Sequence, residues 1–227
     1  MEWKQDYTAL IISYVYVFGI IATGELLRRA GKRPPEFTRK FIHVGVGMWS
    51  IGTVALFETW PFAIIPPITF VVINAVSYWR GVFQSMESEE RGNLGTIYFP
   101  IAFAVAIYAF WEHPLLLVAT LMPMTWGDAM AAIVGRRFGH YTYTVGGRTR
   151  SLEGSLAMLF WSWLATSAAI FGMPYLIGLF YVSWLLALMV GGVVAIVCTL
   201  VEALSPWGID NLTVPAAAGL LLNMLLG

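Results

Sequence analysis

The chain has 227 residues, of which 59% are hydrophobic and 11% are charged, and its mean hydropathy is +0.74. Soluble domains carry about 25% charged residues, so this composition excludes an ordinary soluble protein and indicates a polytopic membrane protein. The formal net charge is zero, and we expect no nucleic-acid partner. The one cysteine, Cys198, lies in an apolar run and cannot form an intramolecular disulfide.

Apolar stretches recur along the chain at roughly the length that a bilayer requires, about 20 residues. We expect an all-α integral membrane protein in which residues 1–227 form one polytopic domain of about eight transmembrane helices. The expected spans are 7–28, 40–57, 60–79, 94–111, 114–136, 153–171, 175–200 and 212–226. The last span is short, and the seventh is long enough to tilt or to break near Gly191 and Gly192.

The basic residues predict the orientation. Of the 13 Lys and Arg residues, all but Lys4 lie in the alternate loops 28–40, 80–93 and 136–153. The positive-inside rule places these loops, and the loop 201–212, on the cytoplasmic side. Both termini are then outside, and the outer connections near residues 58–60, 112–114 and 172–174 are too short to build a site. We therefore expect a cell-membrane protein whose active site faces the cytoplasm.

Polar residues at the start of the second span have two interpretations each. Arg39 and Lys40 either set the topology by reaching the membrane edge or bind phosphate. His43 lies about one turn deeper, where a histidine is more often a hydrogen-bonded packing residue than a catalyst. Glu25 and Asn74 are also polar within apolar spans and are candidates for interhelical hydrogen bonds.

The second loop predicts little chemistry. Glu87, Glu89 and Glu90 are expected to form a solvated acidic patch. The glycines that follow, including Gly95, allow a turn that packs near the other inner loops.

The stretch from Trp126 to Ser155 begins in one apolar span and ends in another. Asp128 is flanked by apolar residues, where a carboxylate costs about 2.5–3.5 kcal/mol on insertion scales. Such a group needs a partner, and the following loop supplies four candidates. They are Arg136, Arg137, Arg148 and Arg150.

Small residues follow Asp128 on one helix face, because Ala132, Gly135 and Gly139 recur at helical spacing. They let a backbone or a ligand approach closely. The stretch is either a helix-packing face with arginines at the membrane edge, or an anion site in which Asp128 holds a cation and the arginines hold phosphate.

The end of the third loop favours the anion site. Gly146 and Gly147 allow a tight turn with exposed backbone N–H groups, which suits an anion. Thr149 or Ser151 can cap the sixth span, and an anion there gains from the helix dipole. Glu153 in the first turn also suits that dipole and needs no further function.

The last inner stretch brings more oxygen donors to the same membrane edge. Glu202 ends the seventh span, and Asp210 and Asn211 precede the eighth. Together with Asp128 they form a set of hard oxygen ligands suited to Mg²⁺ carrying a nucleotide.

Four motifs together resemble one family. TRKFIH, WGDAMAAIVGRRFG, RTRSLEGSLAM and VEALSPWGIDNLTVP are similar to the motifs of CTP-dependent polyprenol kinases, a family that includes dolichol kinases, phytol kinases and yeast-type CTP-dependent diacylglycerol kinases. The resemblance extends from about Glu25 to Pro215. The family often has Lys before Ser151, where this chain has Arg150. The change keeps the positive charge but replaces a compact ammonium with a planar guanidinium.

The resemblance implies a multi-span kinase that transfers the γ-phosphate of CTP to a membrane prenol, polyprenol or diacylglycerol hydroxyl. Asp128, Glu202, Asp210 and His43 are the catalytic candidates, and Asp128 and Asp210 the expected Mg²⁺ ligands. The expected nucleotide-binding residues are Lys40, Gly135, Arg136, Arg137, Gly139, Arg148, Arg150, Ser151, Glu153, Gly154 and Asn211.

Two other functions remain open. A cytidylyltransferase that makes a CDP-lipid would use much the same residues. A transporter would spread polar residues through the spans and on both sides, whereas here they cluster on one side. The sequence does not identify the alcohol, the general base or the oligomeric state.

Overall fold

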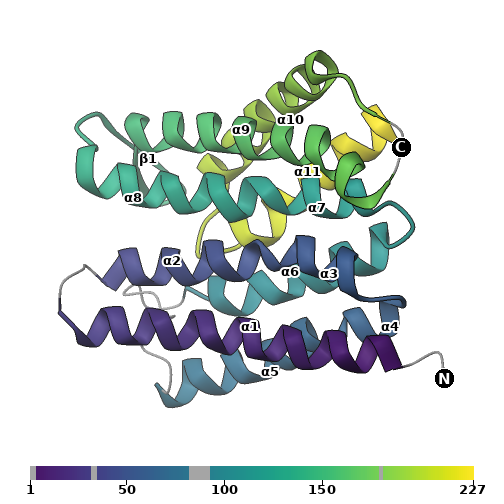
Figure 1. Cartoon of the computed structure of the whole chain (residues 1–227). Helices are drawn as coiled ribbons and strands as arrows, with labels where there is room; N and C mark the ends of the chain where they lie inside the picture. Colours follow the sequence, from purple (N-terminus) through teal and green to yellow (C-terminus); the bar gives the residue numbers. More distant parts are fainter. Residues whose placement is uncertain (1–3, 32–34, 82–92, 179–180) are drawn as a thin grey trace.

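Long helices lie side by side in the computed structural model, which describes residues 4–31, 35–81, 93–178 and 181–227 (Figure 1). The helices are α1 (Lys4–Arg29), α2 (Pro35–Gly47), α3 (Trp49–Leu56), α4 (Trp60–Ala63), α5 (Ile65–Arg80), α6 (Gly95–Phe110), α7 (Pro114–Met122), the π-helical turn η1 (Pro123–Asp128), α8 (Ala129–Phe138), α9 (Leu152–Ile177), α10 (Trp184–Leu204) and α11 (Asp210–Leu226). Two strands, β1 (Thr142–Val145) and β2 (Arg148–Ser151), pair antiparallel.

Each expected span except the seventh corresponds to one helix or to consecutive helices, so the prediction of an all-α membrane protein is confirmed in outline. Five helical segments are long and apolar enough to cross a bilayer, and α6 and α11 are shorter apolar helices. The five segments are Lys4–Arg29, Trp60–Arg80, Pro114–Phe138, Leu152–Ile177 and Trp184–Leu204. The count of eight spans and the cytoplasmic orientation stay predictions.

Two expectations about the sixth and seventh spans are wrong. The helix α9 continues through Gly172 and Pro174 and ends only at Gly178, whose φ of 69° closes it, so residues 172–174 form no connection. Membrane helices tolerate an internal proline. The helix α10 has no break at Gly191, where the missing side chain instead lets Ser167 of α9 approach, since a Cβ would lie 2.2 Å from its Oγ.

The third loop also differs from an all-α arrangement, because it contains the β1–β2 hairpin. Gly146 and Gly147 form its two-residue turn with φ of 58° and 77°, and two positive φ angles are what a tight hairpin turn requires. Figure 1 shows the hairpin beside the end of α8, with both chain termini at the opposite end of the molecule.

The segment α7–η1 is the buried centre of the fold. Leu117, Leu121 and Met124 are fully buried within it. Gly127 allows α9 to pack closely, because a Cβ there would lie 2.1 Å from Ser162 Oγ. This packing fixes the end of η1, where Asp128 projects.

A buried carboxylate also stabilises the opposite end. Asp6 Oδ1 accepts hydrogen bonds from the backbone N–H groups of Glu58, at 2.8 Å, and Thr59. Asp6 therefore joins α1 to the connection between α3 and α4.

Several predictions fall outside the described residues. They concern the acidic patch Glu87, Glu89 and Glu90 and the basic residues Lys32, Arg33 and Arg91.

Candidate active site

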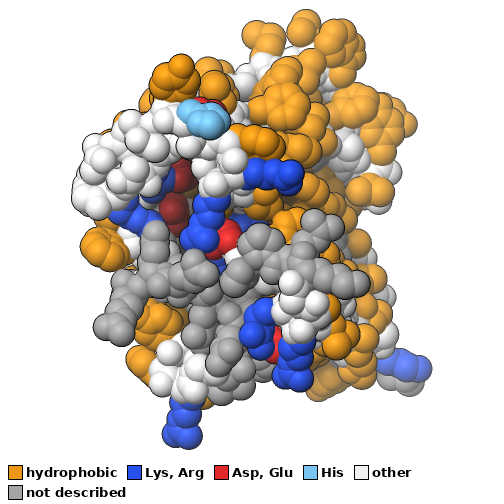
Figure 2. All heavy atoms as spheres, turned by 90° about the vertical axis from the view of Figure 1, so that its left-hand side faces the viewer, with side chains coloured by type: hydrophobic (Ala, Val, Ile, Leu, Met, Phe, Trp, Pro, Cys, Tyr) orange, Lys and Arg blue, Asp and Glu red, His pale blue; other side chains and the backbone are white. Residues whose placement is uncertain are grey.

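A polar cavity of about 270 Å³ opens at the hairpin end of the molecule. Its walls come from α2, α8, the hairpin, the end of α10 and the start of α11. Figure 2 looks onto this end and shows acidic side chains deep in a hollow with basic side chains around it, while hydrophobic side chains cover the flanks.

Three buried carboxylates meet in this cavity. Asp128 comes from η1, Glu202 from the last turn of α10, and Asp210 from the first residue of α11. One oxygen of each lies within 4.8 Å of the other two. The expectation that these residues converge is confirmed, and Glu202 joins Asp128 and Asp210 as a possible metal ligand.

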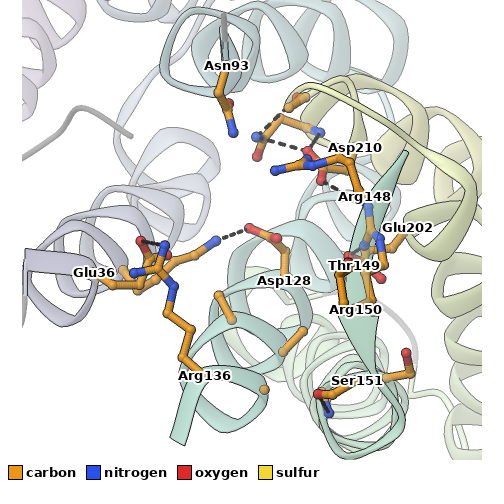
Figure 3. A pocket seen from close by; sticks show the side chains of 18 of the residues that line it. Glu36, Asn93, Asp128, Arg136, Arg148, Thr149, Arg150, Ser151, Glu202 and Asp210 are labelled. Carbon is orange, nitrogen blue, oxygen red and sulfur yellow. Dashed lines mark hydrogen bonds and ion pairs between the residues drawn. The ribbon is translucent and has the colours of Figure 1, made fainter. Parts of the chain in front are cut away.

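Lys40 is the ion-pair partner of Asp128. Its Nζ donates to Asp128 Oδ2 at 2.6 Å, and its side chain is 4% exposed (Figure 3). The prediction that an arginine of the following loop pairs with Asp128 is therefore wrong. The reason is tertiary, because α2 packs against η1 and α8 and brings Lys40 across 88 positions of sequence.

Arg150 lies between the other two carboxylates. It forms an ion pair with Glu202, donates from Nη2 to the backbone oxygen of Ser205 at 2.7 Å, and lies 4.0 Å from Asp210 Oδ2. Burial lowers the pKa of its guanidinium, and the Asp210 carboxylate opposes that shift. Arg150 thus offsets part of the negative charge of the three clustered carboxylates.

A second ion-pair group lines the outer wall. Glu36, at the start of α2, pairs with Arg39 and lies 3.4 Å from Arg136 Nη2. Burial raises the pKa of the Glu36 carboxyl, but the charges of Arg39, Lys40 and Arg136 outweigh it and hold that pKa below its usual value. In the sequence, Glu36 has only the pattern of a helix-start residue, and no local signal predicts its ion pairs with Arg39 and Arg136.

Glycines let the hairpin and the start of α9 approach α8. A Cβ on Gly135 would lie 3.5 Å from the Cα of Gly154, and one on Gly139 would lie 2.8 Å from Ser151 Oγ. Ser151 caps α9 as expected, since its Oγ accepts from the N–H of Gly154 at 3.1 Å.

Glu153 does not line the cavity and instead holds the chain that leads into the hairpin. Its Oε1 accepts from the backbone N–H groups of His140, at 3.0 Å, and Tyr141, at 3.2 Å. This contact is structural.

His43 belongs to the boundary of the site. Its Nε2 is 2.8 Å from the carbonyl oxygen of Met124 and 3.6 Å from Asp128 Oδ2, and its ring packs on Phe99. Because a carbonyl only accepts, we assign the Nε2 proton to the bond with Met124. His43 therefore joins α2 to η1, as the packing interpretation expected.

The expected site residues thus divide into two groups. His43, Arg137, Gly139 and Glu153 do not line the polar cavity, and Arg137 lies over the ring of Phe138. The other expected residues line it, and they are Lys40, Asp128, Gly135, Arg136, Arg148, Arg150, Ser151, Gly154, Glu202, Asp210 and Asn211.

The segments before α11 and before α6 each contribute a cavity residue to which the sequence assigned no role. Gly208 has a φ of 81°, and a Cβ there would lie 2.6 Å from the N of Gly95 and 2.3 Å from Asn93 Oδ1. Asn93 and Gly208 both line the cavity. The expectation that Gly95 packs near another of the long polar loops is confirmed, and the side of the membrane stays a prediction.

The carboxylate group fits a hard divalent cation. All three donors are oxygens, which Mg²⁺ prefers. Among the described residues of the group, Lys40 and Arg150 each pair closely with one carboxylate, whereas Asp210 is 4.0 Å from Arg150. A bound divalent cation would offset the mutual repulsion of three carboxylates held this close together.

The chain is similar to proteins named for one activity. It is 32% identical to "Phytol kinase" of Synechocystis sp. over 94% of this chain and 89% of the relative. "Probable phytol kinase 1, chloroplastic" of Oryza sativa is 29% identical over 85% of this chain and 65% of the relative. "Phytol kinase 1, chloroplastic" of Arabidopsis thaliana is 24% identical over 88% and 70%.

No family model and no solved structure matches the chain. The match to the cyanobacterial relative nevertheless extends over nearly the whole of both chains. The chain therefore belongs to the polyprenol and phytol kinase family that its motifs resemble.

Proposed function

We propose that this protein is a lipid-alcohol kinase that transfers the γ-phosphate of CTP, with Mg²⁺, to the hydroxyl of a membrane isoprenoid alcohol such as phytol. One observation carries the proposal, namely three buried carboxylates within 4.8 Å of one another at the floor of a cavity lined by basic side chains. The names of the relatives support a phytol-type alcohol as the acceptor.

The cavity supplies what phosphoryl transfer needs, which is positioning and charge neutralisation. Asp128, Glu202 and Asp210 would hold Mg²⁺, which when bound neutralises the charge of the triphosphate. Arg136 and Arg148 lie on opposite walls, on α8 and β2, and are placed to contact phosphate oxygens (Figure 3).

The transfer forms a bond between the alcohol oxygen and the γ-phosphorus. The bond from that phosphorus to the β–γ bridging oxygen breaks, so CDP leaves. The hydroxyl proton passes to a carboxylate of the Asp128, Glu202 and Asp210 group. We assign His43 a positioning role, since its Nε2 is bonded to the Met124 carbonyl.

The donor and the reaction are tested with purified protein and γ-labelled CTP. Phytol, dolichol and diacylglycerol are offered in turn, and we expect labelled lipid phosphate and unlabelled CDP with an isoprenoid alcohol. A CDP-lipid with release of pyrophosphate, formed from a lipid phosphate, would instead identify a cytidylyltransferase.

The cytoplasmic orientation is part of the proposal and is supported by the basic residues at the cavity end. Thr144 in the hairpin and Glu112 between α6 and α7 are both exposed and lie at opposite ends of the molecule. In right-side-out cells, an impermeant maleimide should label Glu112→Cys but not Thr144→Cys. The native Cys198 is fully buried and gives little background. Labelling of both variants from outside would contradict a one-sided site.

A further inference from the structure

A second, apolar cavity adjoins the polar one. It lies between α1, α2, α5 and α6. The side chains that form its walls include Val17, Ile21, Ile42, Phe70, Phe99 and Phe103. Each of these is at most 8% exposed, so the walls belong to the packed interior.

The two cavities share part of their lining at one end. Arg39 and Asn211 line both of them. His43 lies in the wall of the apolar cavity, yet its Nε2 is 3.6 Å from Asp128 Oδ2, which belongs to the polar one. One end of a molecule in the apolar cavity would therefore lie beside the cluster of Asp128, Glu202 and Asp210.

Two unpaired oxygens point to a polar ligand at that end. Asn211 and Asn74 are 7% and 8% exposed, and both line the apolar cavity. Asn211 Nδ2 donates to the Gly208 carbonyl and Asn74 Nδ2 donates to the Thr96 carbonyl, but within the described residues neither Oδ1 has a hydrogen-bond partner. Buried polar atoms in native proteins are almost always hydrogen-bonded, so a donor from a ligand is expected here.

We propose that this apolar cavity binds the hydrocarbon chain of the isoprenoid alcohol and that Asn211 Oδ1 accepts the hydrogen bond of its hydroxyl. The inference rests on the proposed kinase function and adds the acceptor site to it. Asn211 was expected to bind nucleotide, and its position between the cavities assigns it to the acceptor instead. Its neighbour Asp210, whose Oδ1 accepts from the Asn211 N–H at 2.9 Å, lies in the polar cavity on the other side of Asn211.

The apolar cavity is elongated along helices α5 and α6. Its lining runs from Asn74 to Pro66 on α5 and from Gly95 to Phe103 on α6, a rise of eight residues on each. Eight residues of helix span about 12 Å. The hydroxyl end lies at Asn74 and Gly95, and the far end lies at Val17, Pro66 and Phe103, so a bulky residue at the far end blocks long chains before short ones.

The test is a chain-length series with Val17→Phe, which narrows the far end. Wild-type protein and the variant are assayed with C5, C10 and C20 isoprenoid alcohols. We expect the kcat/KM for the C20 alcohol to fall about tenfold or more, mostly through KM, while the C5 alcohol is used as before. Ala168→Phe is the matched control, because it introduces the same side chain into a different apolar hollow, between α3, α7 and α9.

The outcomes separate this inference from the proposed function. If Val17→Phe leaves the preference for the C20 alcohol unchanged, or if Ala168→Phe removes it, the acceptor site is elsewhere although the kinase function stands. If wild-type protein phosphorylates no alcohol of any length, the proposed function itself fails.

A second measurement uses only wild-type protein and does not depend on turnover, so it tests the proposal even if Val17→Phe does not fold. Wild-type protein is irradiated with a C20 alcohol that carries a diazirine at its far end, and the labelled peptides are identified by mass spectrometry. We expect labels in α1, α5 and α6. Labels confined to α7 and α9 would overturn the assignment.

Discussion

Lys40 Nζ lies 2.6 Å from Asp128 Oδ2 and joins α2 to the buried turn η1 at the floor of the polar cavity. Both side chains are largely buried, at 4% and 14% exposure. A lone carboxylate at this depth would be costly, so Lys40 keeps Asp128 charged while no cation is bound. The pair also sets the position of the three carboxylates relative to the apolar cavity, since Arg39 and His43, which line that cavity, come from the same helix as Lys40.

Lys40→Ala should therefore destabilise the protein, and Mg²⁺ should compensate. Removing one partner of a buried ion pair costs about 3–5 kcal/mol. A divalent cation that binds the carboxylates supplies the lost positive charge, so Mg²⁺ should raise the Tm of the variant more than that of the wild type. Thermal melting in detergent with and without Mg²⁺ measures this. Arg137→Ala, outside the cavity, is the control, and a Lys40→Ala protein that melts like the wild type would contradict the role of the pair.

A comparison of Arg148→Ala with Arg137→Ala tests whether the basic residues bind phosphate or only orient the protein in the membrane. Arg148 lines the polar cavity and Arg137 does not, although both lie in the stretch 136–153 that the sequence predicted as one basic loop. Loss of a charge-assisted phosphate contact costs about 1.5–3 kcal/mol, so Arg148→Ala should weaken CTP binding by roughly tenfold to a hundredfold. Equilibrium binding of labelled CTP gives the comparison. Equal effects of Arg148→Ala and Arg137→Ala would show that the loop acts only through its net charge.

The sequence predicted the helices and most of the cavity for physical reasons. Apolar runs of membrane length determine where helices form, and Asp128 is conspicuous because a carboxylate is costly there. The partner of Asp128 was not predictable, because Lys40 and the arginines carry the same charge and only tertiary packing selects between them. Glu25 shows the same limit, since its ion pairs are with Arg28 and Arg29 of its own helix, whereas Asn74 does join α5 to α6.

The hairpin and the apolar cavity depend on tertiary packing, which local sequence patterns do not predict. Gly146 and Gly147 predicted a tight turn, but the pairing of Thr142–Val145 with Arg148–Ser151 depends on a polar loop lying over α8 and α9. The apolar cavity is lined by residues of six helices. No periodicity within one span distinguishes such a wall from ordinary packing.

Gly208 and Gly178 form a matched pair for testing the turn before α11. Both have positive φ, 81° and 69°, but a Cβ on Gly208 would meet the backbone of Gly95 at 2.6 Å, whereas Gly178 has open space around it. Gly178→Ala should cost only the left-handed backbone penalty, about 1–2 kcal/mol. Gly208→Ala adds overpacking of about 1–3 kcal/mol and should also raise the KM for the alcohol, because Asn211 moves with the turn. Similar melting temperatures for the two variants would argue against the close approach.

The carboxylates give the last prediction. Asp128→Asn, Glu202→Gln and Asp210→Asn keep the size of each side chain and remove its charge, which carries the affinity for a hard cation. Kinase turnover should fall by orders of magnitude in each variant, and the Mg²⁺ concentration for half-maximal turnover should rise in those that retain activity.

Asp6→Asn is the matched control for these variants, because Asp6 is also a buried carboxylate, 1% exposed, but lies at the opposite end of the molecule. It should lower the Tm through its contacts with the Glu58 and Thr59 N–H groups and leave the Mg²⁺ dependence unchanged. If Asp128 served only to pair with Lys40, Asp128→Asn would behave like Asp6→Asn, with a lower Tm and an unchanged Mg²⁺ profile. Wild-type turnover at limiting Mg²⁺ in the Asp128→Asn or Asp210→Asn protein would therefore rule out the metal site.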